Sequence, residues 1–269
     1  MKFRLVLIFL IGLLLFSCAD KQTKKNVLVE KSIEYSAEGV KLKGFLVYDD
    51  QVKGKRPGVL VVHEWWGLND YAKRRARMLA ELGYTAFALD MYGEGKNTEN
   101  PEEAQKLAMS IYQNMKTGED RFLAAYNFLK NYEITDPDKI AAIGYCFGGS
   151  IVLQMARVGT DLKAVVSFHG GIQPVTSAEK GKVNAYILVC NGAADKSVTP
   201  EQIQNFKTEM DTAGVHYNFV NYDGALHAFS NPEADSLGKK FNIPIAYNEK
   251  ADKESWQEMV NLFKQVLEK

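Results

Sequence analysis

The chain of 269 residues is poor in cysteine and histidine and has no excess charge of either sign. It contains three cysteines and four histidines, and its 33 basic side chains balance 33 acidic ones. Three cysteines cannot build the dense disulfide framework that holds a small secreted scaffold together. A nucleic-acid-binding protein normally shows a basic excess or patch, so the balanced charge gives no reason to expect DNA or RNA as a partner.

What the chain does have is the composition of a globular protein. Hydrophobic residues make up 46% and charged residues 25%, close to ordinary averages. Such a chain can bury a sizeable core, which excludes disordered and collagen-like classes. No long segment repeats, and the length suits one large domain or two small ones.

The N-terminus has the pattern of a secretory signal peptide. Lys2 and Arg4 precede an apolar run, Leu5 to Phe16, of about a dozen residues. A helix needs roughly 20 apolar residues to span a bilayer, so this run is too short to be a transmembrane helix. We therefore assign residues 1–17 to a signal peptide.

Directly after this run lies the first cysteine. Residues 15–18 read Leu-Phe-Ser-Cys, which resembles a bacterial lipobox and implies that Cys18 becomes the lipidated first residue of the mature protein. The polar, lysine-rich residues 18–26 would then form a flexible tether. Several acyl chains would hold the exported protein at a bacterial membrane, facing the periplasm or the cell surface, without spanning it. The alternative is ordinary secretion with Cys18 as a spare thiol.

Residues 27–269 alternate between short apolar runs and longer helical patterns, which predicts one α/β domain with a doubly wound, mostly parallel sheet. Val27–Tyr35 and Val40–Asp49 alternate in hydrophobicity and predict an antiparallel hairpin at the start of the sheet. The other predicted strands are Pro57–His63, Tyr84–Asp90, Lys139–Gly144, Lys163–Phe168, Ala185–Asn191 and His216–Tyr222. The predicted helices are Asp70–Leu82, Pro101–Tyr132, Gly148–Arg157, Pro200–Ala213 and about Lys250 to Leu267.

The second cysteine lies at a junction between a predicted strand and a predicted helix. Residues 144–149 read Gly-Tyr-Cys-Phe-Gly-Gly, which is the G-x-C-x-G pattern of a nucleophile elbow. The tight turn would lift the side chain of Cys146 above the sheet edge, where the helix N-terminus favours a thiolate. The alternative is a small buried cysteine beside glycines that allow the helix to pack closely on the strand.

An activated nucleophile needs a base, and the base needs an orienting acid. In α/β-hydrolases these follow the nucleophile in the order acid, then histidine, on loops after later strands. Asp195 and His227 fall at the carboxyl ends of two later predicted strands, in that order. Considered separately, Asp195 could be a loop aspartate that caps a helix, and His227 could be a surface histidine. Together with Cys146 they indicate a catalytic triad at the edge of the sheet where open α/β sheets bind ligands.

These residues and their surroundings resemble the dienelactone hydrolase family, which consists of cysteine hydrolases of the α/β-hydrolase fold. The resemblance extends from about Val27 to the C-terminus and implies that fold for residues 27–269. The matching segments are 63–67 (His-Glu-Trp-Trp-Gly), 90–93 (Asp-Met-Tyr-Gly), 144–149, 192–195 (Gly-Ala-Ala-Asp) and 222–229 (Tyr-Asp-Gly-Ala-Leu-His-Ala-Phe).

The resemblance also implies roles for residues around the nucleophile. The family's glutamate at the position of Glu64 lies beside the thiol and takes part in its activation, and a carboxylate there is a credible proton acceptor. The alternative for Glu64 is a salt bridge at a strand end. The backbone N–H groups of Trp65 and Phe147 match the family's oxyanion hole, and the elbow itself predicts the second of these donors.

We expect Trp66, Tyr92 and Tyr145 to line the substrate pocket, as could Trp65, although paired tryptophans beside a strand are often core residues. His63 and His169 lie near strand ends and are further candidates for the pocket. Cys190 lies inside an apolar strand and is expected to be an inert core thiol. A disulfide between Cys146 and Cys190 would consume the nucleophile.

The sequence departs from the family where the substrate carboxylate is bound. The family uses arginines shortly after the Asp-x-Tyr segment and shortly after the catalytic histidine, but here no arginine lies between Arg77 and Arg121 or after Arg157. Lys96 or Lys240 could supply a point charge, although a lysine cannot copy the guanidinium fork. We therefore expect an ester, lactone or similar acyl substrate outside the cytoplasm rather than a dienelactone, with little preference for a free carboxylate.

No cofactor is predicted. The spacing of histidines and carboxylates matches no metal motif, and residues 144–149 lack the lysine and hydroxyl residue of a phosphate-binding loop. The partners that we expect are a small ester or lactone substrate and a membrane reached only through the lipid, with the protein as a monomer.

The sequence thus predicts a carboxylic ester hydrolase that forms an acyl-enzyme at Cys146. The alternative is a non-catalytic lipoprotein that keeps the hydrolase fold and binds a ligand in its pocket. A hydrolase of another bond beside a carbonyl is also compatible with the same fold.

Overall fold

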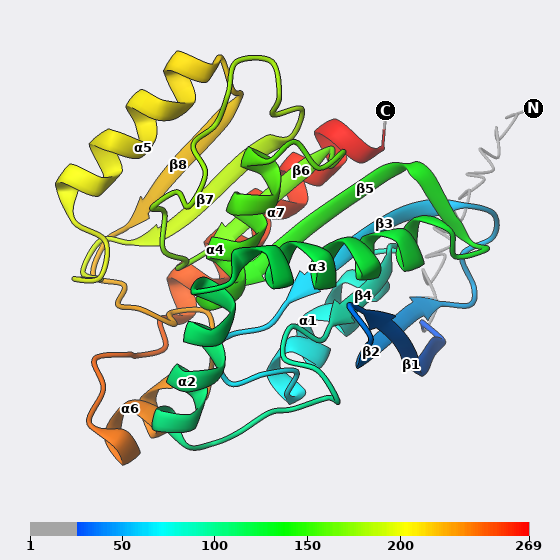
Figure 1. Cartoon of the computed structure of the whole chain (residues 1–269), viewed down its shortest axis with the longest axis horizontal. Helices are drawn as coiled ribbons and strands as arrows, with labels where there is room; N and C mark the ends of the chain where they lie inside the picture. Colours follow the sequence, from blue (N-terminus) through cyan, green and yellow to red (C-terminus); the bar gives the residue numbers. More distant parts are fainter. Residues whose placement is uncertain (1–25, 269) are drawn as a thin grey trace, which may run out of the picture.

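A computed structural model describes residues 26–268 and shows an eight-stranded sheet with helices on both faces (Figure 1). The strands are β1 (Leu28–Ala37), β2 (Val40–Asp49), β3 (Arg56–Val62), β4 (Thr85–Leu89), β5 (Thr135–Tyr145), β6 (Ala164–Phe168), β7 (Tyr186–Gly192) and β8 (Tyr217–Tyr222). The helices are α1 (Asp70–Glu81), α2 (Pro101–Tyr112), α3 (Met115–Lys130), α4 (Phe147–Arg157), α5 (Pro200–Ala213), α6 (Ala234–Phe241) and α7 (Glu249–Leu267).

The strand order is β1-β2-β4-β3-β5-β6-β7-β8. The β1–β2 and β2–β4 pairs are antiparallel, and every pair from β4 to β8 is parallel. The hairpin turns at Glu38 and Gly39, whose φ angles of 50° and 77° suit a two-residue turn that follows the twist of the strands. This arrangement confirms the predicted mostly parallel sheet led by an antiparallel hairpin, and it is that of an α/β-hydrolase.

Two hydrophobic cores lie on opposite faces of the sheet because side chains alternate along each strand. Helices α2 to α5 cover one face and α1 and α7 the other, and Figure 1 shows α3 and α4 in front of the sheet with α7 behind it. Along β5, Ile140 and Ala142 face the first core, whereas Ala141, Ile143 and Tyr145 face the second. The central strands are therefore buried on both sides, as parallel strands are.

Helix boundaries follow the caps that the sequence contains. Asn100 and Thr199 accept hydrogen bonds from the first-turn amides of α2 and α5, and Gly214 ends α5 with a φ of 70°. The predicted helix Pro101–Tyr132 is wrong in its continuity, because the chain breaks it into α2 and α3 at Gln113 and Asn114. Asn114 leaves the helical conformation and its amide side chain donates to Thr117 in the first turn of α3.

Helix α6 was not predicted from the sequence. It is short, ends at Asn242 with a φ of 51°, and is followed by Pro244. The segment after it runs beside the loop that follows β8, where Ile245 pairs with His227 in a short parallel bridge. The unpredicted segment therefore contributes to the edge of the sheet where the triad was expected.

The predicted signal peptide, Cys18 and nearly all of the predicted tether lie outside the described residues. Between residues 26 and 268, no helix has the length and apolar character needed to cross a bilayer.

Candidate active site

Cys146 occupies a strained turn between β5 and α4. Its φ of 53° and ψ of −115° are unusual for a residue with a side chain. The turn depends on its glycines, because a Cβ atom on Gly144 would lie 2.0 Å from the carbonyl oxygen of Gly148. A Cβ atom on Gly148 would lie 2.3 Å from the carbonyl oxygen of Val62 on the neighbouring strand. The sequence pattern of an elbow thus corresponds to a real elbow, with the half-buried thiol at the carboxyl end of the sheet.

Asp195 and His227 meet at the same edge. Nδ1 of His227, which follows β8, lies 2.7 Å from Oδ2 of Asp195, which follows β7. The other carboxylate oxygen of Asp195 accepts hydrogen bonds from the amide and hydroxyl groups of Ser197, at 2.9 and 2.7 Å. Burial disfavours the charge, but the hydrogen bonds from His227 and Ser197 prevail and lower the pKa of Asp195 to about 2. Asp195 is therefore a carboxylate at neutral pH and keeps a proton on Nδ1 of His227.

The imidazole of His227 also interacts with Cys146. Burial acts to lower the pKa of His227, but the charge of Cys146, the hydrogen bonds with Asp195 and Cys146 and the charge of Asp195 place it well above the usual range. His227 is thus a strong proton acceptor between the thiol and the carboxylate, and the imidazolium that forms when it accepts the proton is stabilised. This is the electrostatic arrangement of an activated cysteine, with Nε2 available to take the thiol proton.

Glu64 follows β3 and is almost completely buried, with an exposed fraction of 2%. Its Oε2 accepts a hydrogen bond of 2.8 Å from Nδ2 of Asn231, four residues after His227. Burial dominates and raises the pKa of Glu64 to about 7, although Asn231 and the nearby charges of His227 and Arg75 oppose the shift. Glu64 shares a cavity with Cys146, and its hydrogen-bond partner is an amide.

The raised pKa of Glu64 predicts a pH-dependent contribution to stability. An unfolded glutamate titrates near pH 4.3, so the contribution is full below about pH 4.3 and is lost as the pH rises through about 7. Glu64→Gln removes this titration. From pH 4 to pH 8, the unfolding free energy of the wild type is therefore expected to fall relative to that of the variant by about 3 kcal/mol. Denaturant unfolding at both pH values measures the change.

The matched control for this measurement is Glu133→Gln. Glu133 is an exposed glutamate between α3 and β5 and is not among the groups that act on Glu64, so its loss is expected to leave the effect of Glu64 on stability as in wild type. An equal pH dependence in wild type and Glu64→Gln would show that Glu64 titrates normally.

The triad residues line a cavity of about 490 Å³. Its walls are mostly apolar, and its basic side chains are Lys196 and His227. The lining residues are Glu64, Trp65, Trp66, Cys146, Ala194, Asp195, Lys196, Ser197, Leu226, His227, Ala228, Asn231, Ile243, Pro244 and Ile245. The cavity therefore brings the predicted nucleophile, acid, base and glutamate together with both tryptophans.

Of the two predicted oxyanion donors, one directly follows the nucleophile and the other lines the same cavity. Phe147 is the first residue of α4, where amides have no partner within the helix. Trp65 lines the cavity, and its carbonyl oxygen accepts a hydrogen bond of 3.0 Å from the hydroxyl group of Tyr92. This bond holds the peptide group between Trp65 and Trp66, whereas the Nδ1 atom of His63 holds the peptide group that carries the Trp65 N–H, through the carbonyl oxygen of Glu64.

The prediction that Tyr92 and Tyr145 line the pocket needs correction. Tyr145 is fully buried on the opposite face of the sheet, stacked on Phe168 and edge-on to Tyr71, because alternation along β5 turns it away from α4. Tyr92 lies behind the pocket wall, where it bonds to Trp65. Trp66 lines the cavity as expected.

The two candidate histidines also lie outside the cavity and are fully buried. Nε2 of His63 accepts a hydrogen bond from the amide of Met91, so the ring proton lies on Nδ1. Nδ1 donates this proton in a hydrogen bond to the carbonyl oxygen of Glu64 and fixes the backbone there. His169 lies behind Cys146 and His227. Both histidines bond to backbone groups around the cavity and do not face its interior.

Three residues at the site could not be anticipated from a motif: Ser197, Asn231 and Lys196. Lys196 lines the cavity, and Lys96 and Lys240, which the sequence had suggested as point charges, do not. Lys240 instead lies 3.5 Å from Glu99.

Cys190 is buried in β7, as predicted. Its exposed fraction is 0%, and burial raises the pKa of its thiol to about 12. The hydroxyl group of Tyr222 lies 3.7 Å from its sulfur. Both Cys146 and Cys190 are free thiols. Within residues 26–268, no cluster of three or more histidine, cysteine or carboxylate side chains could hold a metal ion.

Comparison with known proteins identifies the family. The model of the dienelactone hydrolase family matches residues 42–267. Among solved structures, a dienelactone hydrolase-like promiscuous phosphotriesterase from metagenomic libraries superposes with a TM-score of 0.84 at 34% identity, covering 89% of this chain and 98% of the other.

Two curated bacterial proteins match over most of their length. The protein usf of Aquifex pyrophilus is 30% identical over 240 residues, which cover 87% of this chain and 98% of the relative. A putative carboxymethylenebutenolidase of Aquifex aeolicus is 28% identical with the same coverage.

Proposed function

The chain belongs to the dienelactone hydrolase family, and we propose that this hydrolase cleaves ester, lactone or related acyl bonds through the triad of Cys146, His227 and Asp195. The observation that carries the proposal is the 2.7 Å contact between His227 and Asp195 in the cavity that also contains the elbow thiol. Nucleophile, base and orienting acid are thus arranged for covalent catalysis.

Acylation begins when Nε2 of His227 takes the proton of the Cys146 thiol. The thiolate attacks the acyl carbon, and the carbonyl oxygen becomes an oxyanion that the amides of Trp65 and Phe147 stabilise. The bond to the leaving oxygen then breaks, and His227 gives its proton to that oxygen. The product of this half-reaction is a thioester on Cys146. Asp195 remains ionised throughout and stabilises the imidazolium.

Deacylation uses the same groups with water as the nucleophile. His227 takes a proton from water, the hydroxide attacks the thioester carbon, and the same amides stabilise the second oxyanion. The carbon–sulfur bond breaks and releases the carboxylic acid, while His227 and Cys146 return to their starting state. Glu64, with a pKa near 7, can exchange a proton near neutral pH and serves as an auxiliary acceptor beside the thiol.

The cavity lining supports a neutral substrate. A guanidinium fork binds a carboxylate in two parallel hydrogen bonds, whereas Lys196 offers only one exposed point charge to a cavity whose walls are mostly apolar. Neutral aryl esters and lactones are therefore expected to be good substrates, and a free carboxylate is expected to improve kcat/KM by less than about tenfold. The measurement compares kcat/KM for matched substrates that differ only in a free or methylated carboxylate.

A preference of several hundredfold for the free carboxylate would contradict this expectation and point to an anion-binding residue in the cavity. Turnover of neither substrate, with thermal stabilisation by both, would instead favour a ligand-binding protein on the hydrolase fold.

We also propose that the protein is exported and anchored to a bacterial membrane through Cys18. The support is the basic flank and short apolar run before Cys18. Cys18→Ser in a bacterial host is expected to move the protein from the detergent-extracted membrane fraction to the soluble fraction. Equal membrane association of wild type and variant would contradict the anchor.

A further inference from the structure

His169 is a buried histidine that the proposed reaction does not use, although it touches both of its central residues. It directly follows β6 and has a φ of 43°, a left-handed conformation that costs energy in a residue with a side chain. Its exposed fraction is 0%, and it does not line the cavity. Both the backbone strain and the burial of a polar ring cost free energy, so specific contacts must offset them.

The first contact of His169 is with the nucleophile elbow. The amide of Cys146 lies 3.2 Å from Nδ1 of His169 and 3.0 Å from the carbonyl oxygen of Phe168, so its N–H is shared between two acceptors. Since the amide can only donate, Nδ1 must be unprotonated. The ring proton therefore lies on Nε2.

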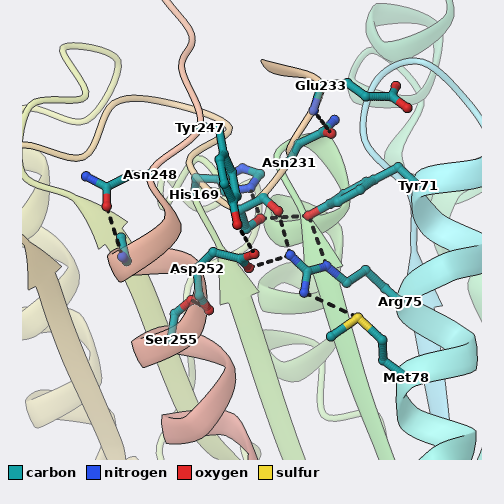
Figure 2. A network of polar contacts seen from close by, with 12 residues as sticks. Tyr71, Arg75, Met78, His169, Asn231, Glu233, Tyr247, Asn248, Asp252 and Ser255 are labelled. Carbon is teal, nitrogen blue, oxygen red and sulfur yellow. Dashed lines mark hydrogen bonds and ion pairs between the residues drawn. The ribbon is translucent and has the colours of Figure 1, made fainter. Parts of the chain in front are cut away.

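The second contact selects this tautomer. Nε2 of His169 lies 2.8 Å from the hydroxyl oxygen of Ser230 and donates a hydrogen bond to it. Ser230 is held in turn by the hydroxyl group of Tyr71 at 2.7 Å and, through its carbonyl oxygen, by Nη2 of Arg75 at 2.5 Å. Figure 2 shows this network, with Tyr71 and Arg75 projecting from α1 and Asp252 from α7 as the ion-pair partner of Arg75.

The third contact is with the catalytic base. The ring of His169 packs edge-on against that of His227, with centroids 5.3 Å apart, and against Phe229 at 5.2 Å. Burial and the charge of His227 keep the pKa of His169 well below its usual range, against the influence of Asp195. His169 is thus a neutral neighbour that does not repel an imidazolium at position 227. The other ionisable groups around it are Tyr71, Arg75 and Tyr145.

We propose that His169 is a positioning residue that fixes the position of Cys146 relative to His227. Nδ1 of His169 holds the amide of Cys146, and its ring packs against the imidazole of His227. Ser230 selects the tautomer of His169 that allows the bond to the Cys146 amide. This role rests on the proposed function of Cys146 and His227. It also explains why the loop after β8 contributes Ser230 as well as His227.

The test measures alkylation of Cys146 by iodoacetamide between about pH 6 and pH 8, because this reaction needs no knowledge of the substrate. The wild type is expected to react readily at pH 6, because His227 accepts the thiol proton. His169→Phe keeps a ring but removes both nitrogens, and it is expected to slow alkylation at pH 6 by about 10- to 100-fold, with a smaller effect at pH 8. Unfolding would also expose the buried thiol of Cys190, so peptide mapping of the alkylated protein is the control for folding: alkylation of Cys190 marks unfolded chains.

Two conservative variants separate the nitrogens. His169→Asn can place an oxygen near the position of Nδ1, and it is expected to recover most of the rate at pH 6. His169→Gln can reach only the position of Nε2 and is expected to behave like the phenylalanine variant. Ser230→Ala leaves His169 in place but removes the tautomer selection, with an expected loss of about 3- to 10-fold. His216→Phe, at the opposite end of the sheet, is the matched control and is expected to react like wild type.

The role of His169 would be overturned if His169→Phe reacts like wild type at pH 6. It would also be overturned if His169→Asn reacts no faster than His169→Phe. In both cases a wild type reactive at pH 6 leaves the proposed function standing. A wild-type Cys146 that is unreactive at pH 6 would overturn this role of His169, whereas the proposed function is tested separately by the turnover of Cys146→Ala.

Discussion

Replacement of Cys146 by alanine is expected to lower kcat/KM on a neutral aryl ester by at least about 10,000-fold. The thiol supplies the atom that bonds to the acyl carbon, so its loss leaves only the cavity and the oxyanion donors. Stability should change little, because the thiol is half-buried at the cavity wall. The measurement is steady-state hydrolysis by the purified variant, with circular dichroism to confirm folding.

The control for this experiment is Cys190→Ala. Cys190 is the other free thiol in the described part of the chain and is buried in β7 away from the cavity. Its replacement is expected to lower thermal stability through lost packing while leaving kcat/KM within about twofold of wild type. Substantial activity in Cys146→Ala, or a collapse of activity in a folded Cys190→Ala, would assign the chemistry to another residue.

The second large effect is expected from Asp195→Asn, with a fall in kcat/KM of about 1,000- to 10,000-fold. The carboxylate accepts the proton on Nδ1 of His227 at 2.7 Å and leaves Nε2 free to act as the base. An asparagine amide can donate to Nδ1 instead, which moves the ring proton to Nε2 and removes the base. It also removes one of the charges that raise the pKa of His227.

The effect of Asp195→Asn is measured as a profile of kcat/KM between about pH 5 and pH 9. Asp223→Asn is the matched control, because Asp223 is exposed and follows β8 only four residues before His227. A folded Asp195→Asn variant within tenfold of wild type at every pH would show that Asp195 does not orient the base.

Much of this site could be predicted from the sequence because its requirements are local. The elbow needs glycines at fixed distances from Cys146, and the close approaches at Gly144 and Gly148 show why. Asp195 and His227 were predictable because both follow apolar strands, and the carboxyl ends of parallel strands meet at one edge.

The failures have equally physical causes. Tyr145 was expected in the pocket because it adjoins the nucleophile, but the alternation along β5 already assigns it, with Ile143, to the opposite face. Helix α6 is too short for its hydrophobic period to be recognised. The split at Asn114 is not marked by any glycine or proline among residues 112–117.

Contacts between distant parts of the chain could not be predicted from one sequence. Glu64 bonds to Asn231, 167 residues later, and His169 bonds to Ser230, 61 residues later. Neither pair belongs to a local motif, so only the folded structure shows that the loop carrying His227 also holds the glutamate and the buried histidine.

The central claim is that the acyl group passes through a thioester on Cys146. The most direct measurement is mass spectrometry of the protein after acid quenching during turnover of a slowly hydrolysed aryl ester, followed by peptide mapping. The account predicts a mass increase equal to the acyl group, confined to the peptide that contains Cys146. Product formation without any covalent acyl mass, or an acyl group on another residue, would contradict it.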